Sequence, residues 1–139
     1  MHKRIPRLIV MVGLSASGKS SYAKELEKEN PTNTIVISSG AIREEICGSV
    51  EDQSKNGGVF RIFHERIRRN LENKKDVIAD ATNITMKSRR AILNRVNGLD
   101  VHKECYIMSK PFSYCVEDNK DREHPVPERV LYKQLSKFQ

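Results

Sequence analysis

Cysteine is scarce in this chain of 139 residues, and its three cysteines are Cys47, Cys105 and Cys115. Their spacing is unlike that of a metal site, and an odd number argues against a disulfide framework. Long apolar runs are missing as well, because no stretch approaches the roughly 20 residues that cross a bilayer. We therefore expect reduced thiols, no membrane partner and a cytoplasmic location.

Repeats, linkers and low-complexity tracts are also absent, so a single domain over 1–139 is expected for this length. The basic N-terminus precedes an apolar run that is too short for a signal peptide. Acidic residues are outnumbered, because 25 lysines and arginines face 18 aspartates and glutamates, which gives a formal net charge of +7. That excess suits a polyanionic partner, and a solvated basic helix surface explains it equally well.

The most informative stretch is 13–20, which reads Gly-Leu-Ser-Ala-Ser-Gly-Lys-Ser and matches the pattern G-x-x-x-x-G-K-S. An apolar run of strand length, 8–12, leads into it, and a helical pattern over 21–28 follows. Glycines let backbone N–H groups surround an anion, and the positive end of the new helix faces the same anion. The alternative is a chance glycine turn, but the flanking pattern favours a nucleoside triphosphate site.

Each residue of this phosphate loop has an expected task. Lys19 would reach the β- and γ-phosphates of ATP, and the Ser20 hydroxyl would hold Mg²⁺. The residues expected to surround the ATP phosphates are Gly13, Ser15, Ala16, Ser17, Gly18, Lys19, Ser20 and Ser21.

Strand-like and helical segments alternate along the rest of the chain. Further strands are expected at 34–37, 76–80 and 101–108, and helices at 41–46, 59–71, 86–97, 111–121 and 128–138. A polar loop is expected from Gly48 to Gly58, and Gly98 is the expected C-cap of the helix over 86–97. The alternation predicts an α/β fold in which a short parallel sheet of about four strands is flanked by helices.

Ligands gather at the carboxyl ends of parallel strands, so the phosphate loop, 38–40 and 80–83 are expected round one crevice. Asp80 ends an apolar strand, a position from which an acid supports Mg²⁺, and capping the next turn is the alternative. Thr82 and Asn83 would either hydrogen-bond a substrate or build the turn.

Five motifs occur in order: the phosphate loop, Ile37–Glu45, Asp52–Asn56, Asp80–Asn83, and Glu117–Arg122 with Asn119 and Lys120. Together they resemble the polynucleotide 5′-kinase family of P-loop phosphotransferases. That family includes the phage 5′-kinase/3′-phosphatase and the kinase module of bacterial RNA-repair enzymes. The resemblance covers about 8–137 and implies a P-loop NTPase fold with a helical lid over about 111–127.

The resemblance assigns tasks to two arginines. Arg43 matches an arginine that contacts the phosphate next to the acceptor hydroxyl, and Arg122 matches a lid arginine that closes over the ATP phosphates. A guanidinium suits developing phosphoryl charge, although a surface helix charge is the alternative for each. The implied catalytic set is Lys19, Arg43, Arg122 and Asp80, and the implied substrate set is Arg43, Ser39, Gly40, Thr82 and Asn83.

Two positions depart from the family pattern. Gly40 stands where the family has the aspartate expected to act as general base, so Glu44, Glu45 or Asp80 would have to serve. There are two further explanations for Gly40: the glycine shapes the start of the helix, or it is a deliberate substitution. Asp118 stands where the repair kinases often carry a first lid arginine, and we expect it to face solvent.

The implied activity is transfer of the ATP γ-phosphate to the 5′-OH of RNA or DNA, with Mg²⁺. Loss of a positioned base typically costs about two to four orders of magnitude in rate, so the activity would be impaired. The alternatives are a small-molecule kinase on the same scaffold and an ATP-binding module with little catalysis. The Asp-x-Asp-Gly-Thr signature of a phosphatase domain is absent.

Overall fold

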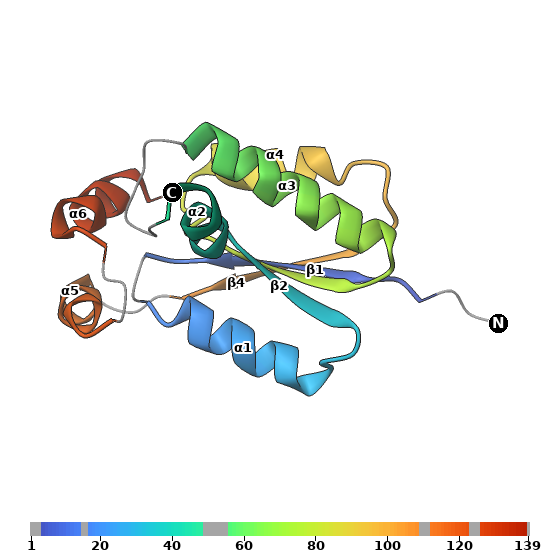
Figure 1. The fold of residues 1–139 in the computed structure, drawn as a ribbon, viewed down its shortest axis with the longest axis horizontal. Coiled ribbons are helices and arrows are strands. Elements are labelled where there is room, and N and C mark those ends of the chain that lie inside the picture. The colour runs from blue at the N-terminus through green and yellow to red at the C-terminus, as the bar shows by residue number, and fades with distance from the viewer. Residues whose placement is uncertain (1–3, 15–16, 49–55, 109–111, 123–125, 139) are drawn as a thin grey trace.

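A computed structural model describes residues 4–14, 17–48, 56–108, 112–122 and 126–138 (Figure 1). In chain order the elements are β1 (Arg7–Val12), α1 (Lys19–Glu29), β2 (Thr34–Ser38), α2 (Ser39–Cys47), α3 (Asn56–Glu72), β3 (Asp76–Asp80), α4 (Met86–Arg95), β4 (His102–Ile107), α5 (Phe112–Lys120) and α6 (Glu128–Lys137). None of the helices described is long and apolar enough to span a bilayer.

The four strands form one parallel sheet in the order β2-β3-β1-β4. The inner strands β1 and β3 are almost wholly buried, because their apolar runs are covered on both faces. The edge strand β4 alternates exposed and half-buried residues. Register places Ser38 of β2 beside Asp80 of β3, so these carboxyl ends meet at one edge of the sheet. The predicted four-stranded α/β fold is confirmed.

Helices cover the two faces of the sheet unequally. In Figure 1, α1 lies on one face, and α2, α3 and α4 lie on the other. The period of two in β1 explains how one strand serves both layers. Leu8, Val10 and Val12 join the core under α3 and α4, whereas Ile9 and Met11 pack with Ala23 of α1.

The start of α3 and the end of α4 differ from their predicted positions. Helix α3 begins at Asn56, so 56–58 are helical rather than part of a polar loop; residues 49–55 lie outside the described part. A glycine pair is tolerated in the first turn of α3 because that turn is followed by a long apolar stripe. Helix α4 ends at Arg95 with Val96 as its C-cap, and Gly98 adopts its positive φ of 90° two residues later.

Candidate functional site

The phosphate loop leaves the carboxyl end of β1 and returns as α1. Gly13 is buried where two segments converge: an added Cβ would lie 2.6 Å from Ser17 Oγ and 3.1 Å from Met108 Cβ. Its N–H donates to the carbonyl of Thr82 at 2.9 Å. Gly18 has a φ of 94°, the left-handed region that suits glycine, just before α1. Both pattern glycines are therefore required by geometry. Ser15 and Ala16 lie outside the described residues.

Lys19 is buried inside this loop, only 7% exposed, and its Nζ donates to the carbonyl of Leu14 at 2.9 Å. Burial lowers its pKa from the ordinary 10.5 to about 8, and the nearby Arg122 acts in the same direction. Asp80 and Cys115 oppose that shift. The chain thus holds a costly ammonium at the point where the pattern places phosphate.

Ser20 and Asp80 form a pair across the sheet edge. The Ser20 hydroxyl donates to Asp80 Oδ2 at 2.9 Å, and Asp80 is buried at the end of β3. Within the described ranges no group of three His, Cys, Asp or Glu residues could hold a metal. One hydroxyl and one carboxylate suit Mg²⁺, which usually keeps several waters and binds substrate phosphates. The residues present fit ATP and Mg²⁺. The buried Ser17 Oγ, for which the described part supplies no hydrogen-bond partner, faces the same loop.

The turn after β3 is held by side chain–backbone contacts. Asn83 is buried with a φ of 49°, and its Nδ2 donates to the carbonyl of Met11 at 2.7 Å. Arg89 donates to the carbonyl of Asn83 at 2.9 Å. These contacts match the turn-building alternative for Asn83, and a substrate contact from Thr82 or Asn83 stays a prediction.

Helix α2 brings two buried polar residues, Ser39 and Arg43, to the same edge. Ser38 caps it, because its Oγ accepts from the N–H of Ala41 at 3.2 Å. Arg43 is 9% exposed, so it is not a surface helix charge. Of the candidate replacement bases on α2, Glu45 is exposed and bound by Arg66 at 2.8 Å, and Glu44 is also exposed.

Gly40 has no conformational need to be glycine. Its φ lies outside the left-handed region, and an added Cβ would meet only Ser38 Oγ, at an ordinary 3.7 Å. The geometry therefore gives no support to the idea that glycine shapes the helix entry. The backbone of this position, in the first turn of α2, accepts a residue with a Cβ.

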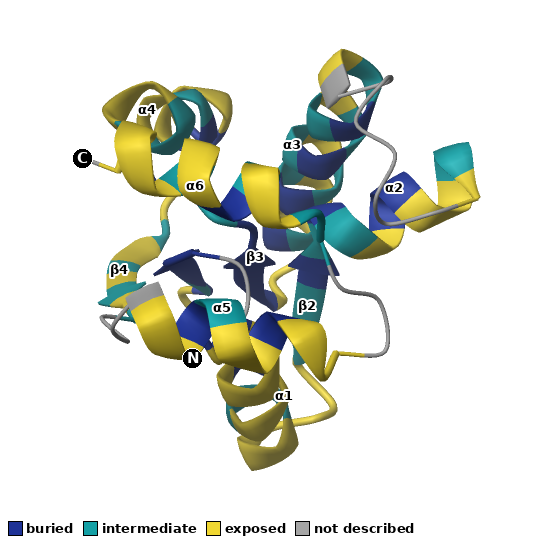
Figure 2. Cartoon of the chain, turned by 90° about the vertical axis from the view of Figure 1, so that its left-hand side faces the viewer, coloured by how far each residue is buried: buried dark blue, intermediate teal, exposed yellow. Residues whose placement is uncertain are grey.

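Helices α5 and α6 lie together beyond the carboxyl ends of the strands (Figures 1 and 2). Cys115 of α5 packs with Leu14 of the phosphate loop and Ile84 of the turn after β3. Asn119 joins the two helices: its Nδ2 donates to the Val126 carbonyl at 2.8 Å, and its Oδ1 accepts from the Val126 N–H at 3.0 Å. Arg122 stands between Asn119 and Val126 in the sequence, and it is exposed. Asp118 is exposed too, as expected.

Residues 8–139 match the family model described as an AAA domain. The chain belongs to the AAA domain family. The predicted kinship with P-loop phosphotransferases is thereby confirmed, and so is the P-loop kinase scaffold of this AAA domain.

One curated relative is the L-seryl-tRNA(Sec) kinase of Methanococcus maripaludis. It is 28% identical to this AAA domain over 134 residues, which are 94% of this chain and 52% of the relative. This chain therefore spans about half the length of the curated relative it matches.

Solved structures establish the fold independently. A chain of the Pnkp1/Rnl/Hen1 RNA repair complex has a TM-score of 0.81 at 18% identity, covering 98% of this chain and 45% of that one. Kti12 from Chaetomium thermophilum, in complex with ADP-AlF3, has a TM-score of 0.74 at 16% identity, covering 95% and 80%. A gluconokinase from Sinorhizobium meliloti 1021 has a TM-score of 0.64 at 20% identity, covering 99% and 77%.

Asn119 of the AAA domain has a structural role that its sequence motif did not predict. Its contacts reach seven residues along the chain, across a helix–helix connection, so no helical or strand period reveals them. The one sequence feature that could have indicated this role is that Asn119 is an amide within the mostly charged motif Glu117–Arg122.

Replacing Lys19 by Met is expected to stabilise the protein at pH 7, by about 1–3 kcal/mol in the free energy of unfolding. Below pH 8 the lysine is protonated in both states, and the folded state bears the full burial cost. Between about 8 and 10.5 unfolding takes up a proton, so wild-type stability rises with pH and the difference between variant and wild type shrinks. Urea unfolding from pH 7 to 11 measures this.

The matched control is Lys24→Met, because Lys24 is exposed on α1. It should change neither the stability at pH 7 nor its pH dependence. If the two variants had the same stability at pH 7 and the same pH dependence, the burial of Lys19 would not carry the expected cost.

Asn119→Ala is expected to weaken ATP binding about tenfold, because the connection that carries Arg122 loses its two fixed hydrogen bonds. Arg122→Ala should then add little further loss in the double variant. Isothermal titration with ATP measures both effects. Asn97→Ala, an exposed asparagine beyond α4, is the control. Strictly additive losses would show that Asn119 does not act through Arg122.

Proposed function

We propose that this AAA domain is an ATP-dependent kinase that transfers the γ-phosphate to the 5′-hydroxyl of an RNA or DNA end. The observation that supports this most is the single sheet edge that collects Lys19, the Ser20–Asp80 pair and the buried Arg43. Two buried cations, Lys19 of α1 and Arg43 of α2, belong to helices that begin at the carboxyl ends of parallel strands of one sheet. That arrangement suits a donor phosphate and an acceptor phosphate held close together.

Each residue has a task in this proposal. Lys19 and Arg122 stabilise charge on the transferring phosphoryl group, and Arg43 binds the phosphate next to the acceptor hydroxyl. Ser20 and Asp80 would hold Mg²⁺, which neutralises charge on the β- and γ-phosphates when bound. The lid region, about 111–127, would close the site over ATP.

In the reaction the acceptor oxygen bonds to the γ-phosphorus, and the bond from that phosphorus to the β,γ-bridging oxygen breaks. ADP leaves with the bond electrons. The hydroxyl proton passes to solvent, because Gly40 offers no acceptor and the Asp80 carboxylate would be committed to Mg²⁺ in this proposal. A loose transition state tolerates this arrangement, since positioning and electrostatics carry most of the catalysis.

An acceptor carried by nucleic acid is favoured by the relatives. One is named for a seryl-tRNA substrate, and one structure belongs to an RNA repair complex. The buried guanidinium of Arg43 adds support, because an uncharged sugar hydroxyl would not require it.

Gly40 favours a second candidate, an ATP-binding module with little catalysis. The space beside its Cα is open, and neither glutamate of α2 replaces the missing carboxylate from a buried position. In that case the domain would bind ATP and respond through its lid, with slow phosphoryl transfer.

Gly40→Asp separates the two candidates. We expect the variant to transfer phosphate from labelled ATP to a 5′-OH oligonucleotide at least tenfold faster than wild type, because a positioned base is restored. Stability should stay equal or rise slightly, since an acid in the first turn complements the helix dipole. The measurement is a single-turnover labelling assay with a 5′-phosphorylated oligonucleotide as the unreactive comparison.

Gly58→Asp is the matched control, because Gly58 also lies in the first turn of a helix with nothing within 4 Å of an added Cβ. It should leave the rate unchanged. ATP binding without labelling in wild type and Gly40→Asp alike would favour the module. Labelling of a small hydroxyl compound alone, such as gluconate, would replace the nucleic acid acceptor by a small molecule.

A further inference from the structure

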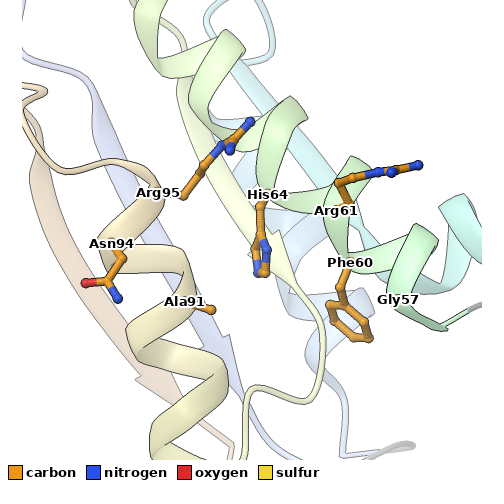
Figure 3. Close-up of a pocket in the computed structure, with 7 residues that line it drawn as sticks. All are labelled: Gly57, Phe60, Arg61, His64, Ala91, Asn94 and Arg95. Carbon is orange, nitrogen blue, oxygen red and sulfur yellow. The ribbon is translucent and has the colours of Figure 1, made fainter.

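A hollow of about 580 Å³ opens between α3 and α4, on the outer side of the helix layer (Figure 3). It is lined by Gly57, Phe60, Arg61, His64, Ala91, Asn94 and Arg95. None of these residues belongs to the candidate functional site. The hollow is therefore a separate surface feature that the proposed chemistry leaves unexplained.

The hollow is built into the packing of the two helices. Gly57 and Ala91 contribute almost no side-chain volume to it, which leaves space between helices that are close-packed lower down. Beneath it, Phe63 and Ile67 of α3, Ile92 of α4 and the α4 C-cap Val96 are fully buried in one core cluster. Arg68 fixes the far end, because its Nη1 donates to the carbonyl of Arg95 at 2.7 Å.

The lining is basic and aromatic. Arg61 and Arg95 are exposed, and within the described ranges neither forms an ion pair. No acidic side chain lines the hollow, and the neighbouring Glu65 is bound by Arg69 at 3.2 Å. Figure 3 shows His64 pointing from α3 into the space and Arg95 extended toward α3, whereas the Arg61 side chain extends from α3 away from α4.

The electrostatics of His64 agree with a surface that lacks a counter-charge. Burial lowers its pKa, and the nearby Arg95 lowers it further. Phe60 lies beside it, with the two ring centroids 6.2 Å apart. Flat rings next to two available guanidinium groups offer contacts for a base and for its phosphates together.

We propose that this hollow binds the body of the nucleic acid acceptor, several nucleotides away from the end that is phosphorylated. The ligand's identity rests on the proposed function. Position supports the idea, because the α3 part of the lining, 57–64, is the first half of a helix that starts at the carboxyl edge of the sheet, and the α4 part follows in the last two turns of α4. A strand whose 5′ end reaches the site can continue along these helices. An acidic peptide would use the guanidinium groups but would leave the rings without a stacking partner.

The test compares Arg61→Gln/Arg95→Gln with the matched control Lys24→Gln/Lys103→Gln, which removes the same charge from exposed lysines of α1 and β4. Binding of a labelled 20-nucleotide single-stranded RNA is followed by fluorescence anisotropy as salt is varied. We expect the arginine pair to weaken binding about tenfold and to reduce the slope of log K against log salt by about 1.4. The control should retain the wild-type slope.

Affinity and slope equal to those of the control would overturn the proposal. The proposal would also be overturned if the arginine substitutions weakened the binding of a labelled poly-glutamate peptide and left the binding of the RNA unchanged. Repeating the binding series in Lys19→Met removes phosphoryl transfer from the measurement. Phosphorylation of a 5′-OH dinucleotide, which lacks the nucleotides that the proposal places in the hollow, should be unchanged in the arginine pair.

These readouts keep the two proposals apart. RNA binding that depends on Arg61 and Arg95, without labelling of any 5′-OH end by wild type or Gly40→Asp, would refute the proposed function and uphold the hollow. Labelling of both long and short acceptors with equal efficiency in the arginine pair and wild type would uphold the function and refute the hollow.

Discussion

The close approach at Gly13 is the constraint on which the rest of the site depends. β1 is an inner strand of the sheet, so its carboxyl end emerges between the ends of β3 and β4. The Gly13 N–H binds the Thr82 carbonyl on one side, and the Met108 backbone lies within 3.2 Å of a Cβ added at Gly13 on the other. A side chain at Gly13 would force Ser17 Oγ and the Met108 segment to shift. Lys19 and Ser20 take their positions relative to Asp80 as a result.

Buried polar groups at the two edges of the sheet are treated differently. At the amino edge, Asp76 is matched by the chain itself: it accepts from the Arg7 N–H at 2.8 Å and pairs with Arg4 at 2.8 Å. At the carboxyl edge, the Lys19 ammonium has a carbonyl as its hydrogen-bond partner, and its pKa falls to about 8. A buried charge whose attraction is incomplete is costly, and a bound anion would remove the cost. Asp76 is thus matched by partners within the fold, whereas the burial of Lys19 is the kind expected at a ligand site.

The sequence predicted most of the fold because each central strand is a continuous apolar run and each strand is followed by a helical period. It also predicted the phosphate loop, since the G-x-x-x-x-G-K-S pattern is local, although the close approach at Gly13 involves Thr82 and Met108, which are distant in the chain. The start of α3 was mispredicted because Gly57-Gly58 reads as a break, and a first helical turn stabilised by the Val59, Phe63 and Ile67 stripe overrides it. Asn83 was open to two interpretations and Asn119 had no predicted task, because their partners are backbone groups that they reach only after folding.

The excess of positive charge had two explanations in the sequence, a polyanionic partner and a solvated helix surface. The structure shows which arginines suit each of them. The basic run of α3 divides into two kinds of arginine: Arg66 and Arg69 bind glutamates, at 2.8 and 3.2 Å, whereas Arg61 faces solvent beside the hollow. The paired arginines fit a solvated helix surface, and Arg61 with Arg95 fits a polyanion contact. In the paired arginines the positive charge is largely neutralised by the nearby glutamate. An arginine without an ion pair keeps a positive potential that extends into the solvent. A basic composition therefore becomes informative about a partner only where the fold leaves cations unmatched next to groups that recognise something besides charge, as Phe60 and His64 do here.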